Sequence, residues 1–180
     1  SQAVIEHADT RFMLVDAPGH VDFSAEAERT LQALDYAILV VGANDGVQGH
    51  TETLWRLLDR YDIPAFIFVN KMDLENPGRE AVAAELLRRL GEGCLDAEKL
   101  LAEGPAQEDA AALDERALEE YLDKGSLSMP TLRRLVRERA LFPCFYGSAL
   151  KNEGVDDFLD GIGKLVEERS WLGDFAARVY

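Results

Sequence analysis

The sequence predicts an α/β fold in which a mainly parallel sheet carries helices on both faces. Short apolar runs of strand length alternate along the chain with segments of helical periodicity. Two of these runs, 37–41 and 65–69, are entirely apolar, which is typical of central strands buried on both faces. The 180 residues, 47% of them hydrophobic, suffice for one domain with a sizeable core.

The remaining elements follow from local patterns. Residues 4–5 and 12–15 are apolar on either side of the polar turn 7–10, which predicts a hairpin. Residues 141–146 form a further candidate strand, with Pro143 near its start, where a missing N–H is tolerated. Helices are expected from apolar residues at i, i+3, i+4 and i+7. They span about 24–34, 51–61, 129–140 and 155–166.

The composition excludes several function classes. The chain has 34 acidic and 19 basic residues and a net charge of −15. Such an acidic surface is not expected to bind the phosphates of DNA or RNA by itself. No apolar run approaches the ~20 residues that a membrane helix needs. Two cysteines far apart in the sequence fit a reducing compartment better than a disulfide scaffold. The sequence therefore predicts a cytoplasmic, monomeric chain without a membrane or DNA partner.

The charge is unevenly distributed. Between Glu92 and Lys124 there are eleven acidic and three basic residues, a net charge of −8. This stretch, at about 91–125, is expected to be a surface excursion of short helices. The arginines of the next helix either form a solvated face that offsets the acidic excursion or contact RNA. These arginines are Arg133, Arg134, Arg137 and Arg139.

The first motif that can carry chemistry is Asp16-Ala17-Pro18-Gly19-His20, between an expected strand and an expected helix. In an open α/β sheet such a segment lies at the carboxyl edge, where ligands bind. Asp16 could hold Mg²⁺ through water, and Gly19 could offer its N–H to a terminal phosphate. The alternative is a plain turn, because Asp, Pro and Gly are turn formers.

A second motif, Asn70-Lys71-Met72-Asp73, follows the most apolar strand. The Asp73 carboxylate can accept two hydrogen bonds from the adjacent N–H and NH₂ of guanine, a donor pair that adenine lacks. Lys71 can lay its methylene stem along the plane of the base. Taken alone, this motif could equally be a turn at the end of a strand.

The third motif, Gly147-Ser148-Ala149-Leu150, follows the last expected strand and precedes the last helix. Its exposed amides could meet a base oxygen, and small residues permit a close approach. This third motif is weak alone. The common place of the three motifs at the carboxyl ends of strands speaks against coincidence.

At these residues the sequence resembles the translational GTPases. Residues 16–20 resemble the family's third GTPase motif, with Ala17 where threonine is usual, while 70–73 resemble its guanine-specifying motif and 148–151 its fifth motif. Residues 21–23 and 45–47 are similar to the elongation factor G-like branch. Residues 43–51 and the stretch from Tyr121 to Pro143 are most similar to the tetracycline-resistance ribosomal protection proteins. Only 73 residues separate Asp73 from Gly147, too few for the extra subdomain of elongation factor G.

This resemblance implies a P-loop GTPase-type sheet that lacks the N-terminal phosphate-loop strand, because the sequence has no Gly-x-x-x-x-Gly-Lys-Ser/Thr. Residues 1–170 are expected to form a partial GTP-binding domain with its acidic helical excursion. Residues 171–180 resemble the start of a following β-barrel domain. The chain is accordingly expected to be a piece of a longer factor and inactive by itself.

The resemblance also assigns roles. His20 would be the catalytic residue that orients the attacking water, Asp16 would hold Mg²⁺ through water, and Gly19 would meet the γ-phosphate. The residues implied to contact GTP or GDP are Asp16, Ala17, Pro18, Gly19, His20, Asn70, Lys71, Met72, Asp73, Ser148, Ala149 and Leu150.

The activity implied for the complete protein is GTP hydrolysis on the ribosome, with rRNA and ribosomal proteins as partners and tetracycline displacement as the result. Two alternatives stay open. The protein could be an elongation factor G or a release factor of the same branch. It could also be a non-enzymatic binding module without a phosphate loop.

Overall fold

The computed structural model describes residues 2–8, 10–16, 31, 34–75, 77–102 and 104–167. The strands of these residues are β1 (Gln2–His7), β2 (Thr10–Val15), β3 (Ala37–Gly42), β4 (Ala65–Asn70), β5 (Cys94–Asp96) and β6 (Phe142–Tyr146). The helices are α2 (Gly49–Arg60), α3 (Arg79–Leu90), α4 (Ala97–Leu101), α5 (Pro105–Ala111), α6 (Glu115–Lys124), α7 (Met129–Arg137) and α8 (Val155–Leu165). In the described part of the chain, no helix has the length and apolar character to cross a membrane.

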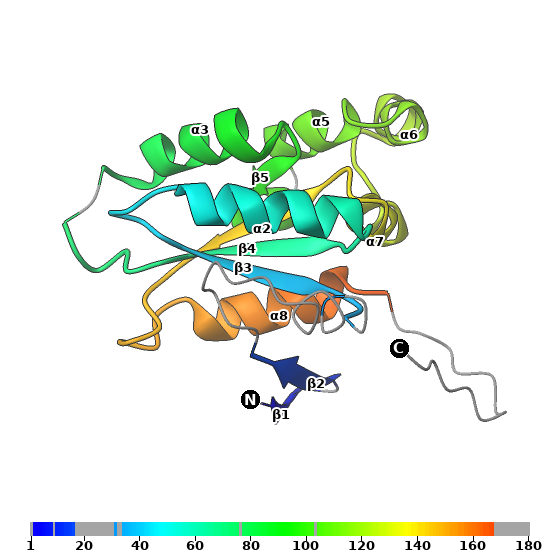
Figure 1. The fold of residues 1–180 in the computed structure, drawn as a ribbon. Coiled ribbons are helices and arrows are strands. Elements are labelled where there is room, and N and C mark those ends of the chain that lie inside the picture. Colours follow the sequence, from blue (N-terminus) through cyan, green and yellow to red (C-terminus); the bar gives the residue numbers. More distant parts are fainter. Residues whose placement is uncertain are drawn as a thin grey trace, which may run out of the picture.

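A parallel four-stranded sheet with the order β3-β4-β6-β5 forms the centre of the molecule (Figure 1). The first five residues of β4 are buried, as expected for a central strand. Gly42 lies opposite Asn70, and Val69 lies opposite Tyr146. The carboxyl ends of β3, β4 and β6 therefore reach the same edge of the sheet.

Helices cover both faces of this sheet, with α2 and α3 on one face and α8 on the other (Figure 1). Side chains that alternate along β4 point to different cores: Ile67 packs with residues of α2 and α3, while Phe66 and Phe68 pack with residues of α7 and α8. This arrangement confirms the predicted α/β fold with a mainly parallel sheet and helices on both faces.

The acidic excursion folds into the short helices α4, α5 and α6, preceded by β5. The edge strand β5 was not predicted. Apolar residues of these helices, including Leu100, Ala110 and Ala117, belong to the second core, so the excursion is more than a surface feature. Some of its acids begin helices: Asp96 accepts hydrogen bonds from two backbone N–H groups of α4, and Asp114 accepts one from Ala117.

All four arginines of the basic segment donate hydrogen bonds within the chain. Arg134 lies 2.6 Å from the Asp114 carboxylate and holds the pKa of that carboxyl below its usual value. Arg133 donates to the Lys164 carbonyl, Arg137 to the Asp35 carbonyl and Arg139 to the Ile63 carbonyl. These contacts favour the interpretation in which the arginines offset the excursion and bind neighbouring elements over the RNA contact.

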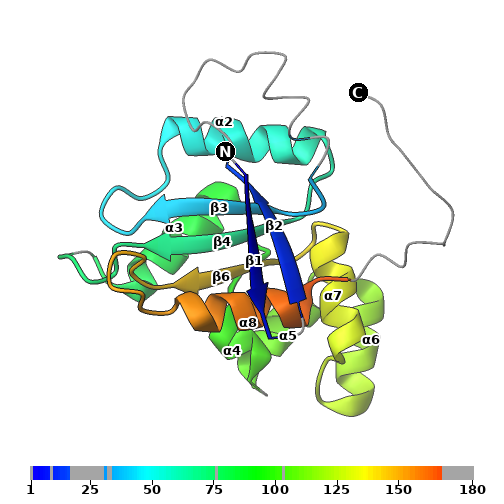
Figure 2. The ribbon, with the colours of Figure 1, turned by 90° about the horizontal axis from the view of Figure 1, so that it is seen from below.

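The predicted hairpin is present but does not join the parallel sheet. β1 and β2 pair antiparallel, with Gln2 opposite Val15, and form a separate two-stranded sheet. The hairpin lies across α8 (Figure 2), where His7 Nε2 is 2.6 Å from Asp160 and Phe12 packs against the second core. The expectation that the strand before Asp16 belongs to the open sheet is therefore wrong for the described strands. The antiparallel pairing with β1 provides hydrogen bonds for the backbone of β2, so β2 does not need to join the parallel sheet.

Two other predictions fall outside the described residues. Of the expected helix 24–34, only residues 31 and 34 are described, and Leu31 is helical and buried. The segment 171–180 is not described at all, so a following β-barrel domain stays a prediction.

Candidate functional site

Two loops meet at the carboxyl edge of the sheet, one after β4 and one after β6. The backbone N–H of Met72 donates to the Gly147 carbonyl at 3.0 Å, and the N–H of Gly147 donates to the Val69 carbonyl at 2.9 Å. The second and third motifs, far apart in the sequence, are thus brought into direct contact.

Asn70 connects the two loops through its side chain. Its Oδ1 accepts the N–H of Lys71 at 2.8 Å and the N–H of Ala149 at 2.9 Å. Lys71 has a left-handed backbone with φ of 64°, a conformation uncommon outside glycine and found often at functional sites. Asn70 therefore holds the two loops together. From the sequence, Asn70 was expected only to contact the nucleotide, and this structural role was not predicted.

Asp73 presents an ionised carboxylate at this junction. Its side chain is only 8% exposed, and its Oδ2 lies 3.5 Å from the Lys151 ammonium. A hydrogen bond from the Ser148 hydroxyl lowers the pKa of Asp73 below its usual value, against the opposing effect of burial. At neutral pH Asp73 is an acceptor-only group whose position is set by neighbours.

The loop after β6 is closed by a short antiparallel bridge. Ser148 is buried, and its backbone exchanges hydrogen bonds of 2.9 and 3.0 Å with Glu153. A Cβ on Gly147 would lie 2.2 Å from the Glu153 carbonyl oxygen, so a larger residue would push this loop apart. The loop leaves Ala149 and Leu150 exposed at its tip, Leu150 to 94%.

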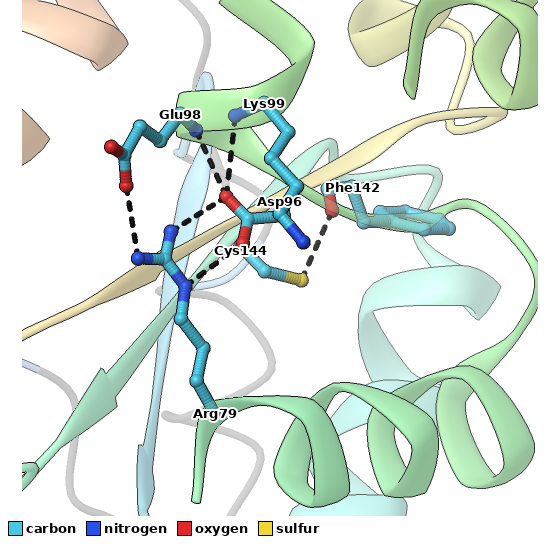
Figure 3. A network of polar contacts seen from close by, with 6 residues as sticks. All are labelled: Arg79, Asp96, Glu98, Lys99, Phe142 and Cys144. Atoms are coloured by element: carbon cyan, nitrogen blue, oxygen red, sulfur yellow. Dashed lines mark hydrogen bonds and ion pairs between the residues drawn. The ribbon is translucent and has the colours of Figure 1, made fainter. Parts of the chain in front are cut away.

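A polar network anchors the segment that leads away from Asp73. Arg79, the first residue of α3, donates to both Asp96 oxygens at 2.8 and 2.7 Å and lies 2.9 Å from Glu98 (Figure 3). Its guanidinium also lies 4.5 Å from the ring centre of Tyr146, the last residue of β6. The start of α3 is thereby tied to the strand that precedes the Gly147 loop.

A cavity of about 390 Å³ opens beside this network, between Arg79, Tyr146 and α8. None of the predicted nucleotide-contacting residues that the structure describes lines it. The candidate base site is instead the open edge formed by 70–73 and 148–150.

The first motif is only partly described. Asp16 follows β2, whereas Ala17, Pro18, Gly19 and His20 lie outside the described residues. Pairing of β2 with β1 does not carry Asp16 to the edge that holds Asn70 and Asp73. Among the residues that are described, no three or more His, Cys, Asp or Glu side chains are grouped to hold a metal ion. The magnesium and catalytic roles stay predictions.

Two residues that contact the site were not assigned a role from the sequence. Lys151 contacts Asp73, and Asp45 Oδ2, from the loop after β3, lies 3.5 Å from the Lys71 ammonium. The position of Asp45 after a central strand was a usable signal, because that strand ends at the same edge.

Comparison with known proteins adds a family and a structural relative. Residues 1–168 match the family model described as the elongation factor Tu GTP binding domain. Solved structures that match include ttk003000868 from Thermus thermophilus, with 25% sequence identity and a TM-score of 0.77. The match covers 92% of this chain and 32% of that one, so the chain spans about a third of that relative's length.

Proposed function

The chain belongs to the elongation factor Tu GTP-binding domain family, and from this premise we propose that the whole protein hydrolyses GTP on the ribosome. These residues are the GTP-binding domain of a translational GTPase. The proposal implies a cytoplasmic protein that meets rRNA and ribosomal proteins. Because this domain is acidic, other parts of the whole protein would supply most contacts with rRNA.

The observation that carries the proposal is the junction of Asp73 and Ser148 at the edge of the sheet. Two oxygens of an ionised carboxylate match the two adjacent donors of guanine, and a nearly buried carboxylate rejects a base that leaves it unpaired. The stem of Lys71 and the exposed Leu150 would lie along the base. The N–H groups of Gly147, Ser148 and Ala149 already donate within the protein, so a contact of this loop with the base oxygen would have to share one of them. The same junction would bind GTP and GDP, since both carry the same base.

The first motif would contact the phosphates of GTP. In the proposal Gly19 approaches the γ-phosphate and His20 orients the attacking water, so that catalysis is positioning and charge stabilisation. Asp16 would hold Mg²⁺ through water, and the bound ion would neutralise phosphate charge. The 180 residues contain no phosphate-loop motif, so the amide nest and lysine that meet the phosphates would have to come from elsewhere in the whole protein.

The decisive experiment compares the whole protein with the 180-residue chain. With ribosomes present, the whole protein should release phosphate from GTP. The 180-residue chain should show no hydrolysis above background and no submicromolar GDP affinity by calorimetry, because the sequence lacks the phosphate-binding loop.

Either arm can contradict the proposal. Submicromolar GDP affinity of the 180-residue chain would show that the phosphate loop is not needed. A whole protein that binds ribosomes without hydrolysing GTP would instead be a non-enzymatic binding module.

We further propose that the ribosomal step is displacement of tetracycline. The similarity of 43–51 to ribosomal protection proteins supports this choice over elongation factor G. So does the short span after Asp73: its described helices, α3 to α7, all contribute to the two cores that flank the sheet.

A tetracycline-inhibited translation reaction tests this step. Whole protein with GTP should restore peptide synthesis, whereas the same protein with a non-hydrolysable GTP analogue should restore less, because release from the ribosome needs hydrolysis. If the protein instead accelerates translocation or release-factor recycling without the drug, it is an elongation factor G or a release factor.

A further inference from the structure

We propose that Asp45 is a positioning residue that holds Lys71 ready for the base, an inference that rests on the proposed function. The Asp45 carboxylate lies 3.5 Å from the Lys71 ammonium, and each side chain is 52% exposed. Asp45 is in the loop between β3 and α2, and Lys71 directly follows β4. The ion pair thus connects the ends of two adjacent strands at the nucleotide edge.

The loop that carries Asp45 is held on two sides. The Gly42 carbonyl accepts the N–H groups of Asp45 and Gly46 at 3.2 and 2.9 Å, which forms a tight turn. The N–H of Ala43 donates to the Asn70 carbonyl at 2.9 Å, and the N–H of Val47 donates to the Glu85 carboxylate of α3 at 3.0 Å. These bonds fix the backbone from which the Asp45 side chain reaches Lys71.

Lys71 needs such a partner because its side chain is long and its backbone is unusual. A free lysine side chain samples many rotamers, and ordering it on ligand binding costs free energy. The left-handed φ of Lys71 sets an uncommon direction for its Cβ. With its ammonium beside Asp45, the methylene stem is ordered before the base arrives, so less ordering remains to be done on binding.

The exposure of the pair argues that its role is positioning and not stability. Exposed ion pairs change the free energy of unfolding very little. Loss of Asp45 should therefore leave the fold intact and weaken nucleotide binding, which separates the two roles experimentally.

The test uses the whole protein with Asp45→Asn, which keeps the size of the side chain and removes its charge. GDP affinity should fall about three- to five-fold, the upper range for loss of an exposed pair. The melting temperature should stay within about 1 °C. Asp45→Glu, which restores the charge, should recover part of the affinity.

A matched control is Glu138→Gln in the same protein. Glu138 is 54% exposed and pairs with Arg134 at 2.7 Å, away from the nucleotide edge. This variant removes a comparable surface charge and should leave GDP affinity unchanged. An equal loss of affinity in both variants would mean that net charge, and not the Asp45–Lys71 pair, is responsible.

A second readout does not depend on nucleotide. Reductive ¹³C-methylation keeps the charge of lysine ammonium groups, and the Lys71 signal can be assigned with Lys71→Arg. In the nucleotide-free protein, Asp45→Asn should shift and sharpen the Lys71 methyl signal. An unchanged Lys71 signal, or unchanged GDP affinity, would overturn the inference. If the unmodified protein binds no GDP, the proposed function is wrong, and the Lys71 signal still decides whether Asp45 holds this lysine.

Discussion

Asp73→Asn in the whole protein should lower GTP affinity by at least ~10²-fold and improve binding of xanthosine triphosphate. The asparagine NH₂ would face a guanine donor, whereas the carboxylate accepts there. Xanthine has a carbonyl at the changed position, which suits that donor. One hydrogen bond to a charged group, which contributes about 1.5–3 kcal/mol, is replaced by two donors that face each other, and the remaining hydrogen bond loses its charge; together these losses account for the size of the effect. Competition between the two nucleotides measures the switch.

A control is needed because Asp73 also accepts a hydrogen bond from the Ser148 hydroxyl and pairs with the Lys151 ammonium, so the substitution could disturb the loop. Thermal unfolding of the variant checks this directly. Asp62→Asn, at an exposed turn before β4, makes the same chemical change away from the carboxyl edge and should not alter base preference. If Asp73→Asn retains the guanine preference of the unmodified protein, Asp73 does not read the base.

The fold could be predicted where burial leaves a periodic signal. The runs 37–41 and 65–69 became β3 and β4, and the helical spacing near 51–61 and 155–166 became α2 and α8. β5 has three residues, too few for any period to show. α3 was missed although Val82, Leu86 and Leu90 recur every four residues and are all buried.

The hairpin shows a different limit. The apolar runs around the polar turn predicted the pairing of β1 with β2, but they do not say whether β2 also joins the parallel sheet. Among the described strands, β2 pairs only with β1. The expectation that a residue after a strand lies at the carboxyl edge of the parallel sheet therefore holds for Asp73 and Ser148 and not for Asp16.

Within the site, the places of the motifs at strand ends predicted which loops meet, but not the contacts between them. Both motifs were expected at the carboxyl ends of parallel strands, and Asp73 and Ser148 do lie together there. The left-handed backbone of Lys71 leaves no mark in the sequence, because lysine is not a residue that such a turn selects. The hydrogen bond of Asn70 to Ala149 and the pairing of Lys71 with Asp45 join loops that are distant in the sequence, so they required the structure.

The largest effect on chemistry should come from His20→Ala in the whole protein on ribosomes. By family resemblance, His20 is where these GTPases carry the side chain that orients the attacking water. It lies outside the described residues, so this role is a prediction. Removing an interaction made mainly in the transition state should leave GTP affinity within about threefold. Ribosome-stimulated turnover should fall by at least ~10²-fold, the low end for loss of a positioned group.

The split between binding and turnover makes this result informative. A solvated turn histidine would affect neither quantity, while a residue needed for the fold would lower both. His50→Ala, at an exposed position in the first turn of α2, removes the same side chain elsewhere and should leave both unchanged. Single-turnover measurements with saturating ribosomes separate hydrolysis from ribosome binding. Near-normal hydrolysis by His20→Ala under those conditions would show that His20 is an ordinary turn residue, because no step of the chemistry would then depend on it.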